Sequence, residues 1–191
     1  MKTLTASAAV RPASPSLELP SAANLRTYAV HFVVRGGMTA MAALGQYALE
    51  NSRFAAPWLT WVVLMPLMGA GLNLYGRRLR RQGLLLDATP AGATMRLLQK
   101  SFLLILLGAM LAACFVGWEL AHPPMLALYG LTTVAAGRVL RFGPLQAGGA
   151  LCVLAAAAAV AVSAHAQLLL IAGAMLAGYV VPGYLLWTRR A

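Results

Sequence analysis

Acidic residues are scarce in this sequence: only four Asp and Glu stand among 191 residues, and charged residues of both signs make up 10%. An ordinary soluble domain carries about 25%. Hydrophobic residues reach 61% and the mean hydropathy is +0.75, which is more apolar surface than a soluble core of this length can bury. The composition therefore argues against a soluble protein and a disordered one, and it predicts a single integral membrane domain.

Sequence motifs of the common chemistries are missing as well. The two cysteines, Cys114 and Cys152, lie in different apolar stretches at different predicted depths, so we expect packing residues and no disulfide. No Walker loop, nucleophile elbow, paired-cysteine zinc motif or dinucleotide fingerprint occurs, and no cofactor is expected. No Asp or Glu falls in the middle of an apolar stretch, which argues against a proton-coupled pump or transporter.

Six apolar stretches predict six transmembrane helices, because each is close to the ~20 residues that cross a ~30 Å hydrocarbon core. The expected fold is an all-α integral membrane bundle, formed by residues 24–191 and preceded by a flexible cytoplasmic tail over residues 1–23. The six stretches lie near 27–49, 57–76, 97–118, 123–140, 145–164 and 167–187. Pro123 and Pro124 are placed in the opening turn of the fourth helix, and Thr89 is predicted to cap the third.

Basic residues predict the orientation. With the N-terminus inside, fourteen of the fifteen Lys and Arg fall on the cytoplasmic side, and only Arg53 falls outside. This positive-inside pattern predicts that both termini are cytoplasmic. Topology accounts for most of the net charge of +11. The expected partner is therefore the lipid bilayer, and nucleic acid is not expected as a partner.

Two stretches of the C-terminal third stand out: PMLALYG at 124–130, which continues through Gly137, Leu140, Arg141, Pro144, Leu145, Gly148 and Gly149, and VPGYLL at 181–186. In these stretches the chain resembles a group of small multi-spanning membrane proteins of Bacteroidetes-type bacteria. The group has a Tyr-Gly helix, a basic turn with Phe-x-Pro-Leu, a Gly-Gly helix and a terminal Pro-Gly-Tyr. This resemblance implies a multi-span architecture in a bacterial inner membrane, and it implies no particular chemistry.

Arginines cluster at the predicted cytoplasmic ends of the second and fourth helices. The members of this cluster are Arg77, Arg78, Arg80, Arg81, Arg138 and Arg141. Arginines next to a span attract anionic phospholipid headgroups, with ~1 kcal/mol for each residue. Three interpretations stay open: contact with anionic headgroups, orientation of the protein alone, or a pocket for a specific anionic substrate.

His31 and Arg35 are one helical turn apart and share one face of the first predicted helix. Ionisable groups at membrane depth are costly, and by default they indicate a functional site. Two interpretations stay open. The two side chains contact a ligand or take part in gating, or else Arg35 extends to the inner headgroups and His31 forms a hydrogen bond with a neighbouring helix.

Four residues that bind metals or transfer protons are predicted at the outer face. These are Glu50, Glu119, His122 and His165. If they converge, carboxylates and imidazoles could hold a divalent metal such as zinc or act as an acid/base pair. The alternative is that they are solvated loop residues, because no His-x-x-x-His spacing is present.

Three functions follow from these patterns. The first is a non-enzymatic regulatory, scaffold or lipid-associated module that acts through helix packing and a basic inner face. The second is a small passive transporter or channel for an anionic or lipid-like solute, using His31 and Arg35. The third is a membrane enzyme or metal protein at the outer face. Small residues in the spans also allow a homodimer.

Overall fold

The computed structural model describes residues 22–82 and 90–189, and over these residues every element is helical. The elements are α1 (Ala22–Asn51), α2 (Leu59–Arg81), α3 (Pro90–Val116), α4 (Trp118–Val139), α5 (Gly143–Ala159), α6 (Ala164–Met175), the π-helical turn η1 (Leu176–Val180) and α7 (Val181–Thr188). The last three form one continuous helix of 25 residues. The prediction of an all-α chain with six helices is therefore confirmed for the described part. The predicted tail up to residue 21 and the cap at Thr89 lie outside it.

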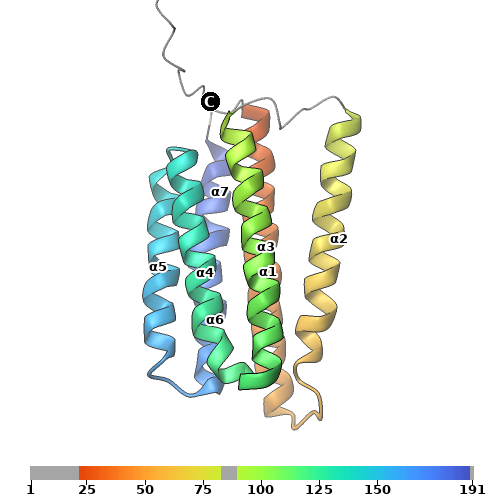
Figure 1. Cartoon of the computed structure of the whole chain (residues 1–191), viewed down its shortest axis with the longest axis vertical. Coiled ribbons are helices and arrows are strands. Elements are labelled where there is room, and N and C mark those ends of the chain that lie inside the picture. Colours follow the sequence, from red (N-terminus) through yellow and green to blue (C-terminus); the bar gives the residue numbers. More distant parts are fainter. Residues whose placement is uncertain (1–21, 83–89, 190–191) are drawn as a thin grey trace, which may run out of the picture.

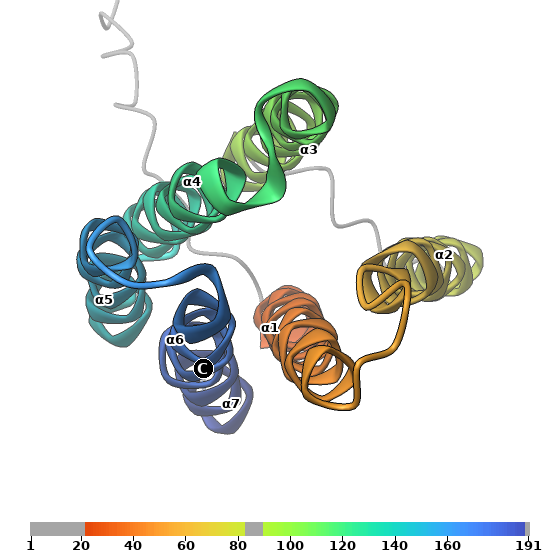
Figure 2. The same ribbon diagram turned by 90° about the horizontal axis from the view of Figure 1, so that it is seen from below.

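The helices run side by side along one axis, with short turns at alternate ends (Figure 1). α4 packs along α5, and α3 packs on α4. α1 lies against the helix formed by α6, η1 and α7, while α2 packs on α1. No close packing joins α2 to α3 within the described ranges, and the view along the helices shows α2 standing apart from α3 (Figure 2).

Glycines set the spacing of α4, α5 and η1. A Cβ added to Gly149 would lie 2.7 Å from the carbonyl oxygen of Gly130 and 2.6 Å from the backbone nitrogen of Val134. A Cβ on Gly148 would collide with the carbonyl of Gly178 in the same way. The backbones can approach this closely only because no side chain stands between them. The small residues in this part of the sequence therefore serve packing inside the bundle.

Prolines account for two departures from the predicted helices. α4 begins at Trp118, so Pro123 and Pro124 lie in its second turn and the predicted opening turn at these residues is wrong. Pro182 has no N–H to donate to the carbonyl of Gly178. The π-helical turn ends at Val180, two residues before Pro182, and is the local widening typical of such an interruption. The fifth helix ends at Ala159, earlier than the predicted residue 164.

Two helices are long and apolar enough to cross a membrane, namely α2 and the continuous helix Ala164–Thr188. Their most apolar windows have mean hydropathies of 1.3 and 1.9, and 6% and 50% of these windows are buried. α5 is apolar but has only 17 residues. Two such helices give weak support for membrane association, and they do not establish the predicted six spans.

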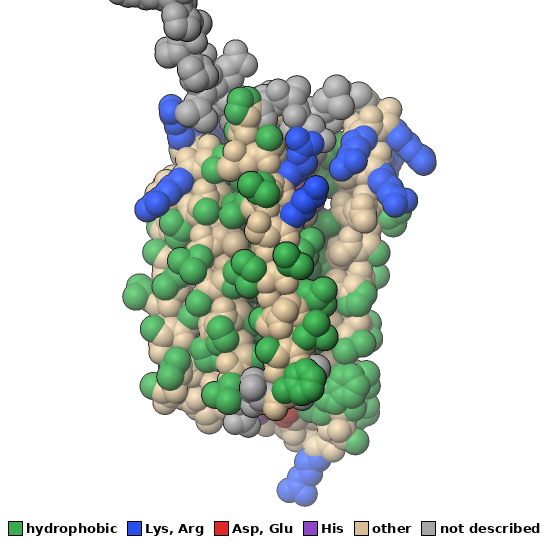
Figure 3. Space-filling view, in the orientation of Figure 1, with side chains coloured by type: hydrophobic (Ala, Val, Ile, Leu, Met, Phe, Trp, Pro, Cys, Tyr) green, Lys and Arg blue, Asp and Glu red, His purple; other side chains and the backbone are tan. Residues whose placement is uncertain are grey.

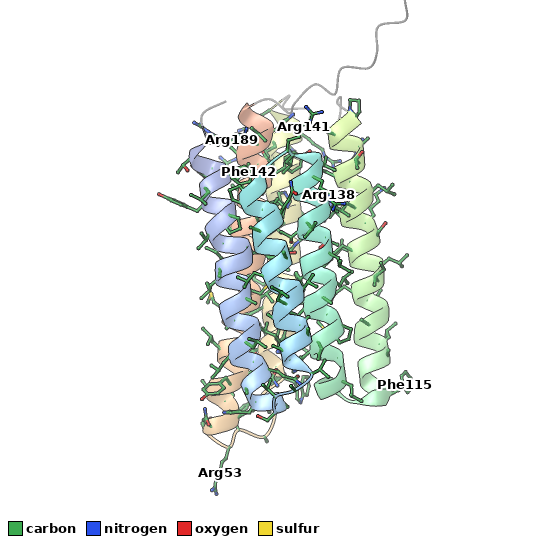
Figure 4. The ribbon with its side chains drawn as sticks, turned by 90° about the vertical axis from the view of Figure 1, so that its left-hand side faces the viewer. Arg53, Phe115, Arg138, Arg141, Phe142 and Arg189 are labelled. Carbon is green, nitrogen blue, oxygen red and sulfur yellow. The ribbon has the colours of Figure 1, made fainter. Side chains whose placement is uncertain are left out.

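On the face shown in Figure 3, Lys and Arg side chains gather at the two ends, and hydrophobic side chains are spread over the surface between them. Arg53 marks one end, at the turn between α1 and α2 (Figure 4). At the opposite end lie Arg138, Arg141 and Arg189 (Figure 4), together with the arginines that close α2. We call these the Arg53 end and the arginine-rich end.

Candidate functional site

A cleft of about 530 Å³ opens near the arginine-rich end, between α1, α2, α3 and α4. It exists because α2 packs on α1 while α3 packs on α4, which leaves the facing sides of α2 and α3 without a helical neighbour. On α2 the lining runs from Met68 to Arg80, and on α3 it runs from Met95 to Leu106. The cleft therefore follows almost half the length of the bundle.

The ionisable side chains that line the described walls of the cleft are all basic or neutral. Arg77 and Arg80 come from α2, Arg96 comes from α3, and His31 and Arg35 come from α1. No Asp or Glu is found among the described lining residues. Like charges in a low-dielectric hollow focus their field and attract counter-ions. The cleft is therefore a cationic cavity suited to an anion.

Arg35 lies deep in the cleft. It is the fourteenth residue of α1, about 20 Å along the helix from Ala22 at a rise of 1.5 Å per residue. Its guanidinium carbon is 5.0 Å from the centre of the Phe102 ring of α3, a cation–π contact. The side chain thus lies across the cleft, instead of extending to the arginine-rich end as the snorkelling alternative requires.

His31 lies one turn nearer the arginine-rich end than Arg35, and both line the cleft, as their shared helix face predicts. The His31 ring lies 6.4 Å from the ring of Tyr75 on α2. The first helix therefore directs one basic and one titratable side chain toward the same cavity.

The inner wall of the cleft is aromatic and firmly packed. The Phe102 and Tyr129 rings lie edge to face at 4.9 Å, and the Tyr129 and Tyr179 rings do so at 5.6 Å. The Tyr179 hydroxyl donates a hydrogen bond of 2.8 Å to the carbonyl oxygen of Tyr129, as does the Thr133 hydroxyl. This wall joins α3, α4 and η1 and holds Phe102 beneath Arg35.

The predicted arginine cluster is divided by the structure. Only Arg77 and Arg80 line the cleft; they are three residues apart and share a face of α2. Arg78 and Arg81 are exposed and are not among the lining residues. Arg138 and Arg141 are exposed at the end of α4, also outside the cleft (Figure 4). The structure therefore brings two of the six arginines to the cleft and leaves four outside it.

Several polar residues of the cleft were not predicted as site residues, among them Asn73 on α2, and Arg96 and Gln99 on α3. Arg96, Gln99 and Phe102 follow one another at intervals of three residues, which places them on one helix face. That spacing was readable in the sequence. What it could not reveal is that this face meets Arg35, because the placement of α3 across from α1 is a property of the whole bundle.

At the Arg53 end, one carboxylate and one imidazole of the predicted outer group come together. His165 Nδ1 lies 2.9 Å from Glu50 Oε2, and the Tyr47 ring stacks on the His165 ring at 4.2 Å. Gln46 donates to Glu50 at 2.7 Å and accepts from the Trp61 indole at 2.5 Å. This network ties α1 to α2 and α6.

His122 lies apart from that network and is 5% exposed. Its Nδ1 is 3.0 Å from Gln167 Oε1, and Gln167 donates to the carbonyl oxygen of Ala159 at 3.0 Å. The prediction of a solvated loop histidine is wrong here, because α4 begins before His122 and turns it into the core. Glu119 belongs to α4, and its side chain is outside the described set. Among the described side chains, no three His, Cys, Asp or Glu gather as a metal site would require.

Comparison of the chain with models of protein families, with curated proteins and with solved structures finds no match. The resemblance of the C-terminal third to small multi-spanning proteins therefore stays a prediction.

Proposed function

We propose that this protein is a membrane bundle of six spanning helices that binds an anionic solute in the cationic cleft and serves as its passive carrier. The observation that carries the proposal is the cleft itself, which brings Arg35 of α1 to the same cavity as Arg77, Arg80 and Arg96. A cavity that reaches Arg35 favours a carrier over a scaffold with a closed core.

The exposed surface supports the membrane part of the proposal. The most apolar window of α2 is only 6% buried, so α2 is not the core helix of a soluble protein. Large apolar side chains on α3, such as Leu104 and Phe115, are 73% and 88% exposed. Soluble monomers rarely expose continuous apolar patches above a few hundred Å². Lipid is the solvent that fits this surface.

The orientation part rests on charge. Arginines at the ends of α2 and α4 lie on the same side as the mouth of the cleft. By the positive-inside rule this side is cytoplasmic, so the cleft would open to the cytoplasm of a bacterium, with both chain termini on that side.

The chemistry of the cleft supports binding and argues for no bond-breaking step. Its described lining holds guanidinium, imidazole, amide and hydroxyl groups, without a carboxylate to relay protons. The Glu50–His165 pair lies at the other end of α1, far from the arginines of the cleft. A membrane enzyme at that end lacks support, because His122 is held in the core by Gln167.

The proposal is tested by calorimetric titration of the full-length protein in phosphatidylcholine nanodiscs, with empty nanodiscs as the blank. The two probes are glycerol phosphate and dihexanoyl phosphatidic acid, which carry the same phosphate group without and with acyl chains. We expect saturable binding of at least one probe, weakened about tenfold or more in Arg35→Gln, because a hydrogen bond to a charged group contributes about 1.5–3 kcal/mol.

Arg78→Gln is the matched control, since it removes the same charge from α2 outside the cleft. We expect it to bind as the unaltered protein does. The proposal fails if neither probe binds saturably, or if Arg35→Gln and Arg78→Gln have the same effect.

A further inference from the structure

We infer that the ligand of the cleft is an anionic lipid, whose phosphate headgroup enters among the arginines while its acyl chains leave the protein sideways between α2 and α3. This inference rests on the proposed function and names the class of its ligand. It follows from how polar and apolar residues are distributed over the depth of the cleft.

The mouth of the cleft and its middle are polar. Arg77 and Arg80 lie within one or two turns of the end of α2, and Arg96 lies about 9 Å along α3 from Pro90. Below them come Asn73 and Gln99, still facing the cavity. The guanidinium fork matches the oxygens of a phosphate better than any other side chain does. A phosphate group therefore has partners from the mouth of the cleft inward.

The floor of the cleft has a different composition on its two sides. Arg35 marks the floor on α1, about 20 Å from the arginine-rich end. At the same depth, α2 presents Met68 and Gly69 and α3 presents Leu103. Leu103 is 51% exposed, and an added Cβ on Gly69 would meet no atom within 4 Å. The side of the cleft at this depth is therefore apolar and open toward the surroundings.

The cleft is closed toward the Arg53 end. There the Thr60 hydroxyl of α2 donates to the carbonyl oxygen of Ala42 on α1 at 3.1 Å, and a Cβ on Gly45 would lie 2.9 Å from the Thr60 methyl carbon. The Trp61 indole bonds to Gln46 one turn further along α1. A ligand that reaches Arg35 thus has no continuation along α1 and α2, and its remaining bulk must leave between α2 and α3.

These three features together describe an amphiphile. A soluble anion would use the arginines but would leave the apolar opening at Gly69 and Leu103 without an occupant. A lipid uses both, because its phosphate pairs with the guanidinium groups and its chains pass through the opening into the surrounding lipid. The positive charge of the cleft selects an anionic headgroup over a zwitterionic one.

The two probes of the binding experiment separate this inference from the proposed function. Dihexanoyl phosphatidic acid should bind at least about tenfold more tightly than glycerol phosphate, because its acyl chains bury apolar surface that glycerol phosphate lacks. Equal affinities would overturn the lipid assignment and leave the anion carrier intact, whereas no binding of either probe would overturn both.

The opening is tested by Gly69→Phe, with Gly71→Phe as the matched control. Both glycines have open space around an added Cβ, but only Gly69 lines the cleft. We expect Gly69→Phe to weaken binding of dihexanoyl phosphatidic acid about tenfold, to leave glycerol phosphate unchanged, and Gly71→Phe to alter neither. Equal losses of both probes in Gly69→Phe, or lipid binding unaffected by it, would contradict the sideways exit.

Discussion

The bundle has two halves that use the same residue type in opposite ways. In α4, α5 and η1, glycines such as Gly130, Gly148 and Gly178 lie where an added Cβ would strike a neighbouring backbone. In α2 and α3, Gly69 and Gly108 have nothing within 4 Å of an added Cβ. The first half is closely packed backbone against backbone, and the cleft lies where α2 and α3 face α1 and α4.

The difference shows that glycine content alone does not indicate close packing. Glycine allows two helices to approach closely, but close packing forms only where a second helix lies beside the glycine. α2 has only α1 as a close neighbour in the described part of the chain. The glycines of α2 therefore leave space in the cleft and at the surface instead of allowing a close contact between helices. Gly69 of α2 and Gly108 of α3 have open space around an added Cβ. The homodimer predicted from such small residues stays a prediction.

The largest expected effect comes from filling a contact in the closely packed half. Gly148→Leu places a side chain against the carbonyl of Gly178, and a backbone cannot yield as a flexible side chain can. We expect a loss of about 3 kcal/mol of stability or more, seen as a lower midpoint of thermal unfolding by circular dichroism in detergent. Gly173→Leu, which meets no atom within 4 Å, is the control and should unfold near the original temperature. Equal midpoints for the two variants would contradict the packing.

The next effect concerns charge in the open half. Asn73→Asp keeps the size of a side chain that lines the cleft and adds one negative charge. Because like charges repel more strongly away from bulk water, we expect binding of dihexanoyl phosphatidic acid to weaken about tenfold, measured by the same titration. Asn51→Asp makes the same change at the exposed Arg53 end and should leave binding unaltered. A matching loss in both variants would show that the effect is one of net charge alone.

A smaller effect is expected at the wall between the two halves. Tyr179→Phe removes the hydroxyl that donates to the carbonyl oxygen of Tyr129 in a buried position. The loss of one such hydrogen bond costs about 0.5–1.5 kcal/mol, which should lower the unfolding midpoint slightly without changing the helix content. Tyr184→Phe is the control, because it removes the same hydroxyl from a tyrosine whose exposed fraction is 63%. A Tyr179→Phe protein as stable as the control would indicate that this bond contributes nothing.

The smallest effect is expected at the Arg53 end. Glu50→Gln removes the charge that faces His165, but the two side chains are 30% and 42% exposed. Partly exposed ion pairs contribute at most about 1 kcal/mol, so we expect little change in stability and none in binding at the cleft. A double-mutant cycle with His165→Asn measures the coupling directly. A coupling of several kcal/mol would show that this network contributes strongly to holding α1 against α6.

Long apolar runs made the six helices predictable, because each run has the length of a helix that crosses a bilayer. The shared face of His31 and Arg35 was predictable from their spacing of four residues. The same helical period places Arg77 and Arg80 on a different face of α2 from Arg78 and Arg81. Which of the two faces lines the cleft is known only from the structure.

Other features depend on contacts between distant segments and could not be predicted. His122 was assigned to a loop because Pro123 and Pro124 suggested the start of a helix, whereas α4 begins at Trp118. The contact of Arg35 with Phe102 joins residues 67 positions apart in the chain. Such pairs are set by how α1, α3 and α4 assemble, which no local pattern records.

The most direct test of the central claim, a water-filled cationic cleft in a membrane bundle, is thiol labelling in proteoliposomes. In a background with Cys114→Ala and Cys152→Ala, a membrane-impermeant charged reagent is added to Gln99→Cys and to Leu104→Cys. Gln99 lines the cleft, while Leu104 is 73% exposed on another face of α3. Because the thiolate is the reactive form and needs water, we predict labelling at position 99 and none at position 104. Labelling of neither position would contradict the open cleft, and equal labelling of both would contradict the membrane bundle.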